Sequence, residues 1–182
     1  MKSRGILRRP WRKLGADRRG VSAVEFAMLA PVMIFFYFGL AEFCQGYMAQ
    51  KRASHSAAMV ADLIAQQERV TGGEIDDIFQ VGELIMAPFT ADGMSLRVSS
   101  ARRINDSTVR IDWSRGSGIA ARATGSSITV PVGLIAIGES VIVSESLYDY
   151  DSPVDYMMPG ITTFSHTFYL RPRTVERVAL VP

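Results

Sequence analysis

The sequence has little of what catalytic and metal-binding sites use most. Its 182 residues include one cysteine, Cys44, and two histidines, His55 and His166. One cysteine cannot form an internal disulfide, and a lone thiol is most often a small apolar packing group. The histidines lie far apart in the sequence, and neither has the H-E-x-x-H or cysteine–histidine spacing of a zinc site. The sequence therefore predicts neither a disulfide framework nor a zinc centre.

The motifs of common enzyme classes are also missing. No G-x-S-x-G elbow, P-loop or dinucleotide-binding fingerprint occurs in the sequence. Aspartates cluster at two places, Asp76 with Asp77 and Asp149 with Asp151 and Asp155. These clusters could attract a divalent cation, but they lack the ordered spacing of an EF-hand and are typical of solvated turns. We expect no catalytic residue, cofactor, metal or small-molecule substrate. An enzyme with an unrecognised site is the weakest alternative, and turnover lost on mutation of either histidine would revive it.

Acidic residues are almost absent from the first twenty residues. Residues 1–20 hold eight lysines and arginines and one acid, Asp17, whereas the whole chain has 20 basic and 18 acidic residues. The chain after Gly20 therefore keeps 12 basic and 17 acidic residues, a net charge of about −5. Basic residues beside an apolar span stay in the cytoplasm. We expect residues 1–20 to be a basic cytoplasmic leader. Nucleic-acid binding would explain the leader less economically, and we expect no such partner.

Charge is absent again over residues 26–41, a run of sixteen. Sixteen helical residues rise about 24 Å, and extension to Val21 and Tyr47 reaches the roughly 30 Å of a bilayer core. We therefore expect residues 21–47 to form a transmembrane helix. A secretory signal peptide fits poorly, because the run is long and no A-x-A-like site follows it before Gln50.

Glu25 is the one charge inside this apolar helix. A carboxylate deep in a membrane helix costs on the order of 3 kcal/mol unless something neutralises it. Cleavage after Gly20 would give Val21 a free ammonium group at a similar depth, on this chain or on a neighbouring copy, and that group could pair with Glu25. Alternatively, Glu25 lies shallow and reaches water at the cytoplasmic headgroups. The spacing leaves both interpretations open.

Residues 18–43, RRGVSAVEFAMLAPVMIFFYFGLAEF, resemble the TadE/TadG-like family of the Flp-type tight-adherence (Tad) pilus machinery. Prepilin-like members of that system are cut after a glycine in the form G-x-x-x-x-E-[FY], which Gly20, Glu25 and Phe26 match. The resemblance extends over residues 18–66, with a weaker echo in TFYLRPR, residues 167–173.

This resemblance implies a minor pilin or pseudopilin that a prepilin peptidase cuts after Gly20. Val21 would become the new N terminus, Glu25 would serve recognition and assembly, and Phe26 is the adjacent aromatic. The expected partners are the membrane, the peptidase, other pilins or pseudopilins and Tad assembly proteins. The expected location is the bacterial inner membrane, in a single pass, with a periplasmic head that could enter the pilus. The alternative is an unprocessed single-pass membrane scaffold of the assembly machinery.

Helical periodicity continues beyond the apolar run. Small or apolar residues recur every three or four positions, at Ala49, Ala53, Ala57, Val60 and Ile64. We expect residues 48–66 to be an amphipathic extension of the same helix, with a break at Gly46 as the alternative.

Residues 67–182 are expected to form a periplasmic α+β head. A loop at residues 71–73 precedes a short helix that ends before Pro88. Alternation with a period of two then predicts strands at 95–104, 108–113, 128–132, 141–150 and 164–170, with a loop over 114–127. The predicted fold class is α+β: a long N-terminal transmembrane and amphipathic helix followed by a small, mostly antiparallel sheet, a pilin-like layout.

Overall fold

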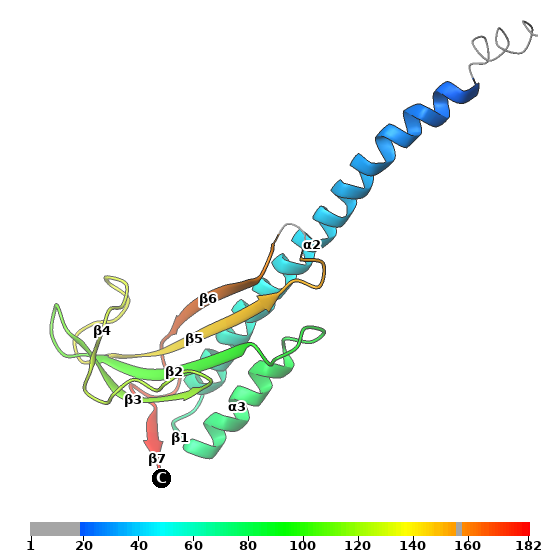
Figure 1. The fold of residues 1–182 in the computed structure, drawn as a ribbon. Coiled ribbons are helices and arrows are strands. Elements are labelled where there is room, and N and C mark those ends of the chain that lie inside the picture. The colour runs from blue at the N-terminus through cyan, green and yellow to red at the C-terminus, as the bar shows by residue number, and fades with distance from the viewer. Residues whose placement is uncertain (1–18, 156–157) are drawn as a thin grey trace, which may run out of the picture.

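The computed structural model describes residues 19–155 and 158–182. A single long helix, α2 (Arg19–Ala65), runs past an α+β head that packs beside its C-terminal half (Figure 1). The helix is unbroken over 47 residues and passes through Pro31 and Gly46. The predicted continuous helix is therefore confirmed, and the alternative break at Gly46 is wrong. The leader up to residue 18 lies outside the described residues.

The head combines one short helix with two sheets among the described residues. The elements are β1 (Arg69–Thr71), α3 (Gly72–Leu84), β2 (Met94–Arg103), β3 (Val109–Ser117), β4 (Ser127–Ile128), β5 (Ser140–Asp151), β6 (Ile161–Leu170) and β7 (Ala179–Val181). Five strands form one sheet in the order β4-β3-β2-β5-β6, with every neighbouring pair antiparallel, while β1 and β7 pair in parallel. The α+β class, with a long N-terminal helix and a mostly antiparallel sheet, is confirmed.

The start of α3 corrects the predicted loop at residues 71–73. Thr71 caps the helix: its side chain accepts from the backbone N–H of Glu74, 3.2 Å away, while Glu74 accepts from the backbone N–H of Thr71 at 2.7 Å. This reciprocal pair satisfies donors that a helix N-terminus leaves unpaired. Gly72 and Gly73 therefore belong to the first helical turn.

The predicted loop over residues 114–127 is wrong at both ends, because β3 runs to Ser117 and β4 begins at Ser127. Hydroxyl pairs extend β3 where apolar alternation stops: the side-chain oxygens of Ser99 and Ser114 lie 2.8 Å apart, and Ser114 also donates to the Val98 carbonyl. The strand expected over 128–132 shrinks to the two residues of β4, and turns follow.

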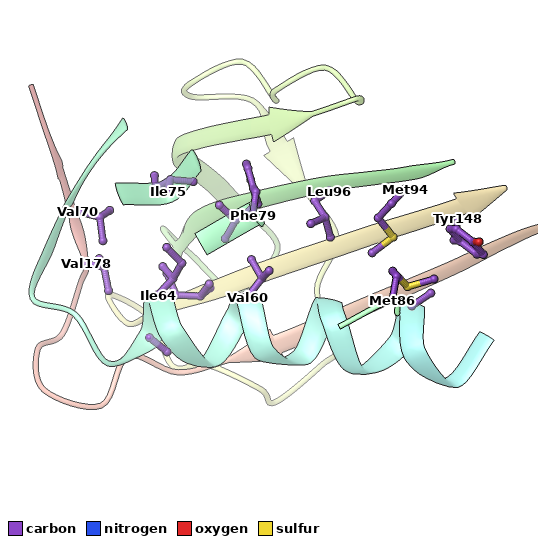
Figure 2. Packing of buried hydrophobic residues seen from close by; sticks show 14 of the residues in the cluster. Val60, Ile64, Val70, Ile75, Phe79, Met86, Met94, Leu96, Tyr148 and Val178 are labelled. Atoms are coloured by element: carbon purple, nitrogen blue, oxygen red, sulfur yellow. The ribbon is translucent and has the colours of Figure 1, made fainter. Parts of the chain in front are cut away.

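The main hydrophobic core lies between α2, α3 and one face of the large sheet. Figure 2 shows Val60 and Ile64 of α2 pointing toward Phe79 of α3 and Leu96 of β2. Alternate residues of β5 pack into different hydrophobic clusters, because successive side chains of a strand point to opposite faces of the sheet. Ile142, Tyr148 and Tyr150 join the main core, whereas Val141 and Val143 join a smaller cluster on the other face.

Two tyrosines of β5 lie in the main core. Tyr148 and Tyr150 are 3% and 2% exposed, so they close the sheet core and do not form a surface patch. The hydroxyl of Tyr148 donates to the Thr90 carbonyl at 3.1 Å.

Candidate functional site

The N-terminal half of α2 projects away from the head (Figure 1). Over residues 20–38 every side chain is exposed except that of Ala30, which is half-buried. These nineteen residues rise about 28 Å, close to the thickness of a bilayer core. Among the described helices, α2 is the one long and apolar enough to cross a membrane. A single apolar N-terminal helix of this kind suggests a single-pass membrane protein.

The predicted processing residues lie at the far end of this exposed segment. Val21 and Phe26 are 52% and 72% exposed, and Glu25 is also exposed. Gly20 lies within the helix, and a Cβ atom added there would meet nothing within 4 Å. Val21 and Glu25 are four residues apart and therefore share one helical face, about 6 Å apart along the axis. The structure thus brings Val21 and Glu25 together on one surface, away from the head.

A stripe of mostly small, buried residues begins where the exposed segment ends. The buried positions follow a seven-residue repeat: Gly39, Glu42, Gly46, Ala49, Ala53, Ser56 and Val60. Small side chains let the helix backbone approach the sheet closely. The side chain of Ser146 on β5 reaches the carbonyl of Ala53 at 3.1 Å, and Ser56 donates to the carbonyl of Gly82 in α3 at 2.8 Å. A Cβ on Gly46 would lie 3.1 Å from the sulfur of Met158, which explains the glycine. The stripe therefore fixes the head on the helix.

Glu42 is the exception in this stripe of small residues. It is fully buried, and one carboxylate oxygen accepts from the Ser152 hydroxyl at 2.6 Å and, at 3.4 Å, from the backbone N–H of Met158. Buried carboxylates are costly unless hydrogen-bonded. Glu42 therefore ties Ser152 and Met158, two residues between β5 and β6, to α2. Sequence reasoning treated Glu42 as the edge of the apolar run. Its spacing of three and four residues from Gly39 and Gly46 was the signal of burial.

The C-terminal motif TFYLRPR holds the other end of α2. The backbone N–H of Arg173 donates to the carbonyl of Ala65 at 2.9 Å, and its guanidinium pairs with Asp62. The last carbonyls of a helix lack partners within the helix, so this contact caps it. Arg171 bonds the Leu134 carbonyl and lies 3.3 Å from Glu139. The motif thus links the last strand of the large sheet to the helix end.

On the sheet face away from α2, Glu145 sits between two arginines. Its oxygens lie 2.7 Å from Arg97 and 2.7 Å from Arg122. Burial raises the pKa of Glu145, but the hydrogen bonds and charges of Arg97 and Arg122 outweigh it and lower the pKa below the ordinary value of 4.5. A carboxyl with a lowered folded-state pKa stabilises the fold above its unfolded pKa and loses that contribution as pH falls through the folded value.

We expect acid to weaken the head through this cluster. Charge-assisted hydrogen bonds contribute about 1.5–3 kcal/mol each, so Glu145→Gln should lower the unfolding free energy at pH 7 by about 2 kcal/mol. The wild type should lose stability from pH 4.5 downward, and the variant should lose less over that window. Thermal unfolding of the full chain in detergent, followed by circular dichroism between pH 3 and 7, measures this. Parallel pH profiles for the two proteins would contradict it.

The aspartate clusters take part in hydrogen bonds within the head. Asp76 accepts two bonds from Arg115, at 2.7 and 2.5 Å, and these lower its pKa. Asp149 accepts from Thr163 at 2.6 Å, and Asp155 accepts from the backbone N–H of Gly160 at 2.7 Å. Over residues 19–155 and 158–182, no group of three histidine, cysteine or acidic residues could hold a metal ion.

The histidines and the cysteine lie on α2 and β6. His55 is exposed on α2, and so is Cys44. His166 faces α2 from β6; burial lowers its pKa, the backbone of Gln50 raises it, and nearby Lys51 lowers it, for a net decrease.

Comparison with known proteins gives one positive result. Residues 20–62 match the family model of TadE-like proteins. Searches of curated proteins and of solved structures found no significant match. TadE-like proteins are a pilus-associated structural family and are not known as enzymes. Residues 20–62 of α2 therefore form a TadE-like segment, and this match confirms the resemblance read from the sequence.

Proposed function

We propose that this protein is a minor pilin or pseudopilin needed for the biogenesis of Flp/Tad-type pili. A prepilin peptidase removes the basic leader after Gly20, residues 21–47 hold the chain in the bacterial inner membrane, and the head over residues 67–182 lies in the periplasm. Residues 48–66 extend the helix and carry the head. The observation that supports this most is that Gly20, Glu25 and Phe26 match the cleavage form in register at an exposed end of α2 that contacts no part of the head.

Gly20 supports the proposal because folding gives no reason for a glycine there. Glycine in a helix costs about 1 kcal/mol relative to alanine. Elsewhere in α2, Gly46 is explained by its contact with Met158, but space around Gly20 is open. Recognition by a peptidase would account for a small residue at this position.

Glu25 supports the proposal in a similar way. It is exposed in a free helix that is otherwise apolar from Phe26 to the head. A carboxylate in that setting is costly unless a cation neutralises it. The ammonium of Val21 on a neighbouring, processed subunit would supply the cation when the two helices pack together. This ion pair would then stabilise the subunit within an assembly.

We expect the mature protein to begin Val21-Ser22-Ala23. Intact mass and N-terminal sequencing of the protein from its native membrane, with and without the peptidase, test this. Gly20→Val, a β-branched change at the cleavage position, should keep the leader, whereas Gly73→Val in the head should be processed normally, because space is also open there. An uncut chain in both strains would contradict processing and would favour the unprocessed membrane scaffold.

A further inference from the structure

Residues 152–155, which follow β5, reach the apolar part of α2 that is proposed to span the membrane. Val154 in this loop lines an apolar groove of 590 Å³ together with Pro31, Ile34, Phe35 and Phe38 of the helix. Figure 1 shows the facing ends of β5 and β6 meeting α2 at the point where the helix leaves the head. The hydrogen bonds of Glu42 to Ser152 and Met158 hold the loop there.

The depth of this groove follows from helix geometry. Pro31 and Phe38 lie 11 and 18 residues beyond Gly20, so they stand about 16 and 27 Å along the axis. In a bilayer core of roughly 30 Å that begins near Gly20, the groove occupies the half nearer the head. Its helical wall is continuous with the exposed apolar surface of residues 26–38. An apolar groove in this position is suited to an apolar occupant, and the hydrocarbon of the proposed membrane lies beside it.

The charges near Val154 limit how deep the loop can go. Asp151 and Asp155 are both exposed, and Asp155 follows Val154 directly. Carboxylates favour hydrated headgroups over hydrocarbon. Val154 is 38% exposed and points into the apolar groove, so the loop fits the boundary between headgroups and hydrocarbon.

We propose that residues 152–155, which follow β5, are a second membrane contact, in which Val154 enters the head-side leaflet and a phospholipid acyl chain lies in the groove beside Pro31 and Phe38. This inference rests on the proposed membrane span of α2. Because Glu42 ties the loop to the helix, the contact fixes the height of the head above the bilayer.

Nitroxide labelling of the full chain in phosphatidylcholine vesicles tests the contact. In a Cys44→Ser background, labels go on Val154→Cys, on Ile34→Cys as a reference inside the span, and on Asp106→Cys as an exposed reference in the head. The ratio of oxygen to water-soluble nickel accessibility should be several-fold higher at 154 than at 106 and should approach that at 34. Spin-labelled lipids should broaden the signal at 154.

The other outcomes separate the possible failures. Nickel access at 154 equal to that at 106, with 34 shielded, overturns the loop contact and leaves the span intact. Nickel access at 34 shows that α2 does not span, and overturns both. A third outcome is that oxygen and nickel both fail to reach the label at 154 until the protein is diluted in lipid. This would show that a second copy of the chain fills the groove, and it would contradict the proposal that an acyl chain does.

Discussion

Glu25→Gln is expected to cut pilus assembly at least tenfold while the amount of protein in the membrane stays unchanged. The amide removes the charge but keeps the size and much of the shape of the side chain. In the proposed assembly, a neighbouring Val21 ammonium would then lose its partner in a low-dielectric setting. A penalty of about 3 kcal/mol corresponds to roughly a hundredfold change in an equilibrium, so a tenfold loss is a conservative expectation. Counting pili by electron microscopy and blotting membrane fractions measure the two quantities.

The matched control for this substitution is Glu68→Gln. Glu68 is also exposed, but it lies in the head next to β1 and outside the apolar segment. It should assemble normally. Glu25→Asp keeps the charge on a shorter side chain and should retain part of the assembly. Normal piliation of Glu25→Gln would rule out the assembly role of the carboxylate.

The state of the N terminus in Glu25→Gln separates recognition from assembly. If the variant is cut after Gly20 but does not assemble, the carboxylate acts between subunits. If it keeps the leader, the carboxylate acts at the peptidase, and the loss of pili follows from failed processing.

The helix could be predicted from the sequence because its signals are local and long. An uncharged run followed by small residues at three- and four-residue steps specifies one helix over 47 residues. The hairpin between β2 and β3 was predictable for a similar reason, since its turn residue Asn105 accepts a hydrogen bond from the backbone of Ser107 within the loop. Local patterns therefore located both elements, although not their end residues.

Other features depend on partners that are distant in the sequence. β1 and β7 have three residues each and pair with one another, Arg69 opposite Ala179, so neither carries a pattern long enough to recognise. The extension of β3 depends on hydroxyl pairs with β2 and not on apolar alternation. Arg173 caps the C-terminal end of α2, and this role depends on a contact with Ala65 that the sequence does not reveal.

The residues of the candidate site show the same difference between local patterns and contacts with distant residues. Gly20, Glu25 and Phe26 could be predicted because their spacing is a linear motif that does not depend on tertiary contacts; their role stays a prediction. Glu42 was missed because an acid at the end of an apolar run normally marks the return to water. Its burial depends on Ser152, which lies far along the chain and reaches Glu42 only through the β5–β6 loop.

Glu42→Ala is expected to lower the unfolding free energy of the full chain by about 2–4 kcal/mol. The substitution leaves the Ser152 hydroxyl and the Met158 N–H without this acceptor, at about 1–3 kcal/mol for a buried group, and it opens a cavity in a packed interface. Glu42→Gln keeps an acceptor oxygen at nearly the same volume and should cost less. Thermal unfolding in detergent measures the difference, with Gln67→Ala, at an exposed position, as the control.

Hydrogen exchange shows whether the loss is local to the junction. In Glu42→Ala the amide of Met158 should exchange faster, because its acceptor is gone, while amides in the core of β2 should change only as much as global stability does. Slow exchange at Met158 in a variant as stable as the wild type would contradict the anchoring role. The structural reason for the expectation is the position of Glu42, which lies one helical turn beyond Phe38, where the exposed segment of about 28 Å ends. Without this anchor, Ser152 and Met158 would lose their attachment to the helix beside that segment, and the head would be held less firmly where the exposed apolar surface ends.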